Sequence, residues 1–333
     1  MSFLNTSLDY GKLPLKNRLI MPPMATAKGE ADGQINEDIL RYYDTKSSGG
    51  YISLIIIEHS FISQAGKAHE RQISVAEDRF VDDLKELAEI IHKNGSKAVM
   101  QINHAGSASK LEVTGIYPVG PSAVLNPRGG TAIPEELNTR GIKEIINDFK
   151  NAASRVKQAG FDGVEIHSAH GYLLNQFLSP LTNKRTDKYG GKITDRIKIH
   201  MEIIKAIRET VGEDYPILLR FGASDYLEGG LSLDDSKSAA KAFENAGVDI
   251  LDISGGFCGY TIPGIHKQGY FSALSKAIRD VVTIPVIVTG GITEPEIAEE
   301  ILRKGEADLI GVGRSIYKDN NWAKNAIERT GKI

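Results

Sequence analysis

The sequence predicts an α/β fold, a single (β/α)8 TIM barrel, and three observations support that prediction. Its 333 residues suit one such barrel. Short apolar runs recur eight times, and helical patterns alternate with them. Several runs are almost continuously apolar, as in parallel strands buried on both faces. An open, doubly wound sheet would normally carry a glycine-rich turn after its first strand, whereas residues 21–25 are Met-Pro-Pro-Met-Ala.

The predicted elements follow in chain order. Eight strands are expected, at residues 18–24, 53–58, 97–102, 161–167, 216–222, 248–254, 284–290 and 307–313. Seven helices are expected among them, at 78–93, 141–158, 195–211, 232–245, 271–280, 294–303 and 322–329. In the first helix Phe80, Leu84 and Leu87 share one face, and Asn94 with Gly95 forms a typical helix end.

Two connections are longer than a plain barrel needs, residues 103–140 after the third strand and 168–194 after the fourth. Both leave the carboxyl ends of strands, where barrels build their active sites, so we expect them to cap a ligand. Arg185 and Asp187 are expected to tie down the second of these loops. No linker or low-complexity tract interrupts the pattern, so residues 1–333 are predicted to form one domain.

Composition excludes several classes of function. The 40 Lys and Arg residues nearly balance 43 Asp and Glu, which gives no electrostatic reason to expect nucleic acid or an anionic membrane as a partner. The 333 residues contain one cysteine, Cys258, which excludes a disulfide or a cysteine-based metal site within them. The longest apolar run, residues 52–57, is too short to span a bilayer. We expect a cytoplasmic protein that binds a small molecule and no metal.

The side chains at the predicted strand ends are mostly hydrogen-bond donors. They include Gln101, His167 and Arg220, and His170 follows closely. No lysine ends a strand, which argues against a Schiff-base aldolase. No His-x-His ends the first strand and acidic residues are sparse, which argues against a metal hydrolase. Donors around a large pocket suit an electron-rich ring system with carbonyl oxygens.

The last two strands end in glycine-rich turns, at residues 289–292 (Thr-Gly-Gly-Ile) and 311–314 (Gly-Val-Gly-Arg). Barrels commonly bind a phosphate here through backbone N–H groups. Arg314 could pair with a phosphate through its guanidinium. Two such turns on adjacent strands favour a phosphate site over simple turn chemistry.

The fourth strand ends in a cluster of polar rings. His167 ends the strand, and His170 and Tyr172 follow within five residues. Two imidazoles can donate to one carbonyl oxygen and stabilise developing negative charge, while a phenol can supply a proton. A single histidine at such a position would more often be structural, but three groups together favour a catalytic role.

Motifs along residues 16–317 resemble the old yellow enzyme family of FMN-dependent NADH:flavin oxidoreductases, many of them ene-reductases. They lie, in the family's order, at residues 16–24, 101–106, 120–123, 160–167, 171–180, 183–191 and 313–314. The resemblance implies FMN as cofactor and NADH or NADPH as hydride donor. It also implies reduction of the C=C bond of an α,β-unsaturated carbonyl compound.

The resemblance also assigns roles to residues of this chain. His167 and His170 would hold the substrate carbonyl, and Tyr172 would donate the proton. The FMN-binding residues it implies are Pro23, Met24, Ala25, His59, Gln101, His167, Arg220, Gly290, Gly291, Gly313 and Arg314. Ala25 departs from the Thr or Cys common in the family, and this departure is expected to alter the flavin potential.

Competing functions stay open at this point. Some relatives, of the dienoyl-CoA reductase type, add an iron–sulfur motif and a nucleotide-binding domain. The 333 residues hold no cysteine cluster, so direct reduction by NAD(P)H is favoured over reduction by a separate partner protein. A dihydroorotate-type dehydrogenase, a flavin-binding protein without turnover and a flavin-free lyase are three further rivals. The resemblance also makes a homo-oligomer conceivable, and it leaves the physiological substrate and the choice of NADH or NADPH undecided.

Overall fold

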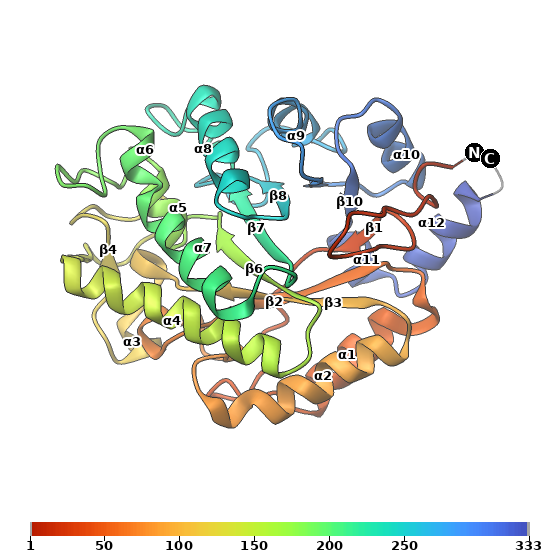
Figure 1. Ribbon diagram of the computed structural model, residues 1–333, viewed down its shortest axis with the longest axis horizontal. Helices are drawn as coiled ribbons and strands as arrows, with labels where there is room; N and C mark the ends of the chain where they lie inside the picture. The colour runs from red at the N-terminus through yellow and green to blue at the C-terminus, as the bar shows by residue number, and fades with distance from the viewer. Residues whose placement is uncertain (1, 332–333) are drawn as a thin grey trace.

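The computed structural model describes residues 2–331, and eight parallel strands in it close into one barrel (Figure 1). Neighbouring strands follow the order β1-β10-β9-β8-β7-β6-β3-β2, and β2 closes the circle against β1. The strands are β1 Leu19–Met21, β2 Leu54–Phe61, β3 Lys97–Asn103, β6 Gly163–Ser168, β7 Ile217–Gly222, β8 Ile250–Ser254, β9 Val286–Thr289 and β10 Leu309–Gly311. The predicted TIM barrel is confirmed.

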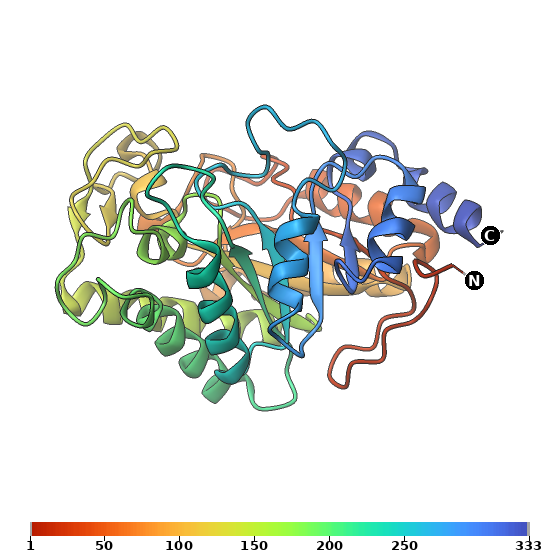
Figure 2. The same cartoon turned by 90° about the horizontal axis from the view of Figure 1, so that it is seen from above.

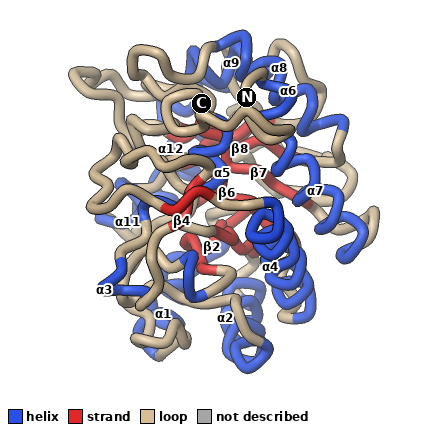
Figure 3. The backbone as a smooth tube through the Cα atoms, turned by 90° about the vertical axis from the view of Figure 1, so that its left-hand side faces the viewer, coloured by secondary structure: helices blue, strands red, loops and turns tan. Residues whose placement is uncertain are grey.

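Helices surround the strands, as Figure 3 shows with helices in blue outside the red strands. The barrel helices are α1 Glu37–Ser47, α2 Val81–Lys93, α4 Thr139–Gln158, α7 Lys198–Val211, α8 Leu233–Asn245, α9 Ser272–Arg279, α10 Pro295–Arg303, α11 Arg314–Lys318 and α12 Trp322–Thr330. Among the described residues, no helix has both the length and the apolar character needed to cross a membrane.

The structure differs from several element predictions, including the end of the last strand, at Gly311, and the unpredicted helix α11. The first strand ends at Met21, earlier than expected, because Pro22 and Pro23 have no N–H to give to a strand ladder. The second strand runs on to Phe61, past an irregularity in its pairing with β3. Helix α1 was not predicted, although Asn36 caps it by accepting a hydrogen bond from the Ile39 N–H.

Both long loops predicted after the third and fourth strands are present. The first contains α3 Leu111–Thr114 and the small strands β4 Val119–Gly120 and β5 Glu135–Glu136, and the second contains α5 Leu173–Leu178 and α6 Ile193–Arg196. Buried Arg185 pairs with Asp187 through two hydrogen bonds of 2.9 and 2.6 Å. The same guanidinium donates to the carbonyl oxygens of Pro121 and Leu137. The expected tie is therefore confirmed, and it also joins the two loops.

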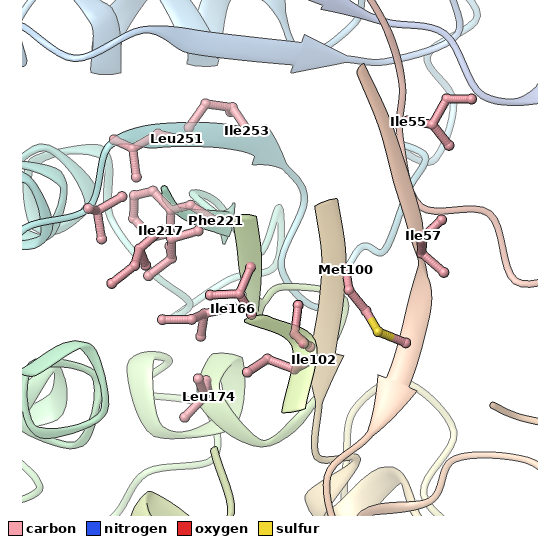
Figure 4. Close-up of a cluster of buried hydrophobic side chains, with 14 of the residues drawn as sticks. Ile55, Ile57, Met100, Ile102, Ile166, Leu174, Ile217, Phe221, Leu251 and Ile253 are labelled. Atoms are coloured by element: carbon pink, nitrogen blue, oxygen red, sulfur yellow. The ribbon is translucent and has the colours of Figure 1, made fainter. Parts of the chain in front are cut away.

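The strands have two buried faces. Outward side chains such as Ile55, Ile57 and Met100 belong to the large core between strands and helices (Figure 4). Inward side chains form a second, smaller core inside the barrel, which includes Leu54 and Ile56. This inner core also contains Leu13, Leu15, Ile20, Val99, Leu218, Ile250, Ile287 and Leu309.

The inner core fills only the end of the barrel where the strands begin. Leu13 and Leu15 come from an N-terminal turn that is closed by pairing of Leu8 with Leu15. In Figure 2 this red turn lies on the opposite side of the barrel from the long loops. The carboxyl ends of the strands, beneath those loops, are therefore left for polar groups.

Candidate active site

A cavity of about 880 Å³ opens at the carboxyl ends of the strands, a size typical of small-molecule sites. The structure brings nearly all predicted site residues into its wall: Pro23, Met24, Ala25, His59, Gln101, His167, His170, Tyr172, Arg220, Gly291, Gly313 and Arg314. Gly290 is the exception, because it does not line the cavity. Its carbonyl oxygen instead accepts hydrogen bonds from the N–H groups of Gly269 and Tyr270.

The floor of the cavity is a layer of paired polar side chains. Gln101 lies opposite Glu165 in the strand register, and its Nε2 donates to Glu165 Oε2 at 2.6 Å. Arg220 lies opposite Asp252, and its Nη1 donates to Asp252 Oδ2 at 2.6 Å. All four side chains are buried. Parallel pairing therefore places each donor beside the acid that orients it.

In this floor, burial shifts the pKa of both acids and one donor has no partner in the protein. Burial raises the pKa of Asp252 to about 6, although Arg220 opposes that shift. Burial and, after it, the charge of Asp252 raise the pKa of Glu165 well above its usual range, although Arg220 and the hydrogen bond from Gln101 oppose that shift. Arg220 keeps Nε, a buried donor, without a protein partner. A ligand that accepts this hydrogen bond would satisfy the group, because an unpaired buried donor is costly.

Three aromatic rings form one wall of the cavity. The ring centroids of His167 and His170 are 5.1 Å apart, and those of His167 and Tyr172 are also 5.1 Å apart. His167 Nδ1 accepts a hydrogen bond from the Ala169 N–H at 3.2 Å, which leaves the ring proton on Nε2. His170 Nε2 lies 2.8 Å from Ser254 Oγ.

These rings are uncharged. Burial lowers the pKa of both His167 and His170 well below the usual range, and neighbouring charges lower it further. Burial raises the pKa of Tyr172, and Arg128 partly offsets that effect. At neutral pH the wall thus presents two neutral imidazoles and a protonated phenol.

The backbone after β6 aims these rings into the cavity. His170 has a φ of 60°, an uncommon value for a residue other than glycine, and Gly171 follows with a φ of 76°. The Gly171 N–H donates to Asn175 Oδ1 at 2.7 Å, which anchors the turn to α5. A left-handed non-glycine residue at a cavity wall is a feature typical of functional sites.

The end of β1 and the bulged part of β2 form a further wall. Glu58 and His59 together oppose Gln101 of β3 where the β2–β3 register shifts, and such bulges redirect side chains. His59 Nδ1 lies 2.8 Å from Gln72 Nε2, so His59 accepts there. Glu58 accepts hydrogen bonds from the N–H and the hydroxyl of Thr26, at 2.9 and 2.7 Å. These contacts hold the segment that contains Ala25.

The far end of the cavity has the features of a phosphate site. Gly291 has a φ of 65°, a conformation that favours glycine, and a Cβ on Gly313 would lie 2.6 Å from Met24 Sδ, so a larger residue there would displace the Met24 side chain. Arg314, Ser315 and Lys318 of α11 line the same end. A short helix after the last strand is a common phosphate-binding feature of barrels.

Sequence reasoning missed several residues of the cavity wall, among them Arg128, Tyr260, Tyr270 and Lys318. Lys318 could have been found, because it follows Arg314 by four residues and so shares its helix face. The other three lie on loops whose course depends on tertiary contacts, and no local pattern marks them.

Comparison with known proteins assigns the chain to a family. Residues 4–331 match the model of the NADH:flavin oxidoreductase / NADH oxidase family. The chain is 44% identical over 324 residues to an NADH oxidase of Thermoanaerobacter brockii, covering 96% of this chain and 50% of that protein. It is 39% identical over 335 residues to an NADPH dehydrogenase of Listeria monocytogenes, covering 100% of this chain and 96% of that protein. The chain thus spans about half the length of the NADH oxidase, and likewise 49% of a metal reductase from Desulforamulus reducens.

Solved structures give the same picture. A 2-naphthoyl-CoA reductase superposes with a TM-score of 0.93 at 28% identity, covering 98% of this chain and 52% of that one. The old yellow enzyme homologue of Zymomonas mobilis superposes with a TM-score of 0.85 at 26% identity, covering 98% and 92%. The barrel and the long loops at its mouth therefore belong to a known architecture.

The cavity fits FMN, the cofactor that these matches support together with NADH or NADPH as electron donor. The unpaired Nε of Arg220 can donate to a ring carbonyl or nitrogen, and Gln101 lines the same cavity. The glycine cradle and Arg314 suit a phosphate at the other end. The chain belongs to the NADH:flavin oxidoreductase / NADH oxidase family, that of the old yellow enzymes.

Proposed function

We propose that residues 1–333 act as one FMN-binding domain that uses NADH or NADPH to reduce the C=C bond of α,β-unsaturated carbonyl compounds. One observation supports this reading above the others. Two neutral imidazoles and a protonated phenol, from His167, His170 and Tyr172, converge in the cavity that also exposes Arg220. Two donors for one oxygen and one proton source are what reduction of an enone requires.

In this proposal the chain holds FMN by both ends. Gln101 and Arg220 bind the pyrimidine edge, and the permanent charge of Arg220 favours the reduced, more electron-rich ring. Gly291, Gly313 and Arg314 bind the phosphate, with Gly290 acting only through its backbone position. Pro23, Met24, Ala25 and His59 contact the ring. When bound, FMN would supply the redox chemistry, accepting hydride from the nicotinamide and delivering it to the substrate β-carbon.

The histidine pair orients and polarises the substrate. His167 donates through Nε2 to the carbonyl oxygen. Ser254 can donate its hydroxyl proton to His170 Nε2, which leaves Nδ1 of His170 as a second donor. Because the rings are neutral, they stabilise the negative charge that develops on oxygen without being consumed as acids.

Tyr172 completes the reduction by giving its phenolic proton to the substrate α-carbon. Its raised pKa keeps the phenol protonated until charge develops next to it. The phenolate then regains a proton from water, since Tyr172 is partly exposed to the cavity. Arg128 lowers the cost of that phenolate because its charge opposes the effect of burial.

The test is the visible spectrum of the purified protein under anaerobic conditions. We expect a yellow protein that bleaches with NADH or NADPH and regains its colour when 2-cyclohexenone is added. Formation of one cyclohexanone for each nicotinamide oxidised would complete the evidence.

Three further outcomes distinguish the rival functions. A protein that bleaches but does not recolour with any enone keeps the flavin site and refutes the roles of His167, His170 and Tyr172. A protein that bleaches only with dithionite requires a separate reductase, as a dienoyl-CoA reductase-like system would. A colourless protein that takes up no FMN contradicts the whole proposal.

A further inference from the structure

The cavity carries more positive charge than its cofactor needs. No Asp or Glu is among the described residues that line it, whereas Arg128, Arg220, Lys267, Arg314 and Lys318 all do. Arg220 is paired with Asp252, and Arg314 and Lys318 belong to the phosphate end. The remaining two cations, on the loops after β3 and β8, have no assigned ligand.

Arg128 is the better placed of these two. Its Nη1 donates to the His170 carbonyl oxygen at 2.8 Å, and its guanidinium lies 5.5 Å from the ring centroid of Tyr260. Its charge also acts on His167, His170 and Tyr172. The cation therefore stands next to the groups that would bind and protonate the substrate. Both side chains are exposed, but Lys267 makes no such hydrogen bond within the described residues, and its charge acts on the carboxylate of Glu300.

The position of Arg128 is built by its surroundings. Buried Asn126 accepts a hydrogen bond from the Arg128 N–H at 2.9 Å and donates to the Gly171 carbonyl oxygen at 2.9 Å. Gly259 leaves room for the guanidinium, because a Cβ there would lie 2.5 Å from Arg128 Nη2. Three segments, after β3, β6 and β8, thus meet around this one side chain.

Only part of the guanidinium is used by these contacts. The described residues offer no carboxylate partner to Arg128, and Nε and Nη2 make no hydrogen bond to them. An arginine that is held in place with free N–H groups, in a cavity without acids, is suited to bind an anion through a fork of two hydrogen bonds.

We propose that Arg128 binds an anionic group of the oxidising substrate, so that the enzyme prefers unsaturated carbonyl compounds bearing a carboxylate over their neutral counterparts. This inference rests on the proposed function, since it names the substrate class of that site. With the carbonyl at His167 and His170, the anionic group would extend toward the loop that carries Arg128. A phosphate of the nicotinamide nucleotide presents similar chemistry, so the test must separate the two sources.

The experiment compares 4-oxopent-2-enoate with its methyl ester as oxidants of the reduced protein. Taking the ratio of kcat/KM for acid and ester removes general effects on folding or flavin content. We expect Arg128→Gln to lower this ratio about tenfold, the value of a partly exposed charge-assisted contact. Arg128→Lys should lose less, because it keeps the charge. Arg140→Gln, an exposed arginine on α4 outside the cavity, should leave the ratio at the wild-type value.

A second arm follows anaerobic bleaching of the oxidised protein by NADH and by NADPH. If Arg128→Gln slows bleaching and leaves the acid-to-ester ratio unchanged, the guanidinium serves the nucleotide and the inference is wrong. If acid and ester lose activity equally, Arg128 only positions His170, and the inference is again wrong.

A binding measurement keeps this test independent of turnover. Benzoate and benzamide are titrated against the oxidised flavin, and the wild-type protein should bind benzoate more tightly while Arg128→Gln loses that preference. A retained benzoate preference in the variant would overturn the inference. If the wild-type protein does not turn over enones but Arg128→Gln still loses the benzoate preference, the proposed function is refuted and the anion site stands.

Discussion

The two ends of the barrel interior are built from the same strands, but one end is apolar and the other is polar. On β7, inward-facing Leu218 belongs to the inner apolar core, and Arg220, two residues on, lies in the polar floor of the cavity. On β8 the corresponding residues are Ile250 and Asp252. The lower end buries hydrocarbon and stabilises the fold. The upper end buries ionisable groups, which cost free energy unless they are paired.

One strand can build both ends because every second side chain points into the barrel. On β7 and β8 a shift from apolar to polar at the next inward position converts a packed interior into a polar floor. The expected consequence is that substitutions at the two ends separate stability from chemistry.

The largest effect is expected from Arg220→Met at the upper end. Removing the cation leaves Asp252 buried without a partner, which costs about 3–5 kcal/mol of unfolding free energy. FMN should also be lost, as measured by retention on gel filtration. Adding Asp252→Asn should restore most of the stability measured by urea unfolding, but not the FMN. If Arg220→Met alone is as stable as the wild type, Arg220 and Asp252 are not energetically coupled.

The matched change at the lower end is Leu218→Ala. It leaves a cavity in the inner core and should cost about 2–5 kcal/mol in the same unfolding measurement. The flavin spectrum and the rate of bleaching by NAD(P)H should stay at wild-type values. A displaced flavin absorption band in this variant would mean that the two ends are not separable.

The pH dependence of stability provides a third comparison, at Glu58. Burial raises the pKa of Glu58 to about 7, from an ordinary value of 4.5. Between these values the folded protein holds a proton that the unfolded chain has released, so this group lowers stability as pH rises from 4.5 to 7. Glu58→Gln does not titrate. Its stability relative to wild type should therefore rise by about 1–3 kcal/mol over that range in urea unfolding. If the difference in unfolding free energy between Glu58→Gln and the wild type does not change with pH, the pKa of Glu58 is not raised.

The smallest effect is expected at Ala25, which lines the cavity without a polar side chain. Ala25→Thr adds a hydroxyl that can donate to the flavin, and such a bond favours the reduced ring. The midpoint potential should rise by about 10–30 mV, the equivalent of one modest hydrogen bond. An unchanged potential in spectroelectrochemical titration would refute the hypothesis that Ala25 alters the flavin potential.

The fold was largely predictable because parallel strands buried on both faces produce apolar runs that stand out in the sequence. Helix α1 was not, because the sequence from Glu37 to Ser47 has few apolar residues and much of it is exposed. The extent of β2 was also missed, because the irregular pairing near Glu58 and His59 arises from its fit to β3.

The candidate site was predictable where it lies at strand ends. Gln101, His167 and Arg220 could be placed in one cavity because strands of a barrel end on the same face. Arg128 and Tyr260 could not, since they reach the cavity from loops that are positioned by contacts such as Asn126 with Gly171. Gly290 does not line the cavity although Gly291 does, and the pattern of two adjacent glycines did not indicate which of them faces it.

The central claim, that this wall of rings reduces enones, is tested most directly by the two half-reactions of Tyr172→Phe. Stopped-flow absorbance would follow flavin bleaching by NADPH or NADH and, separately, recolouring by 2-cyclohexenone. We predict that recolouring slows about a hundredfold, the usual value of a lost general acid, while bleaching changes far less. Equal slowing of both half-reactions, or unchanged recolouring, would contradict the role of Tyr172 as proton donor.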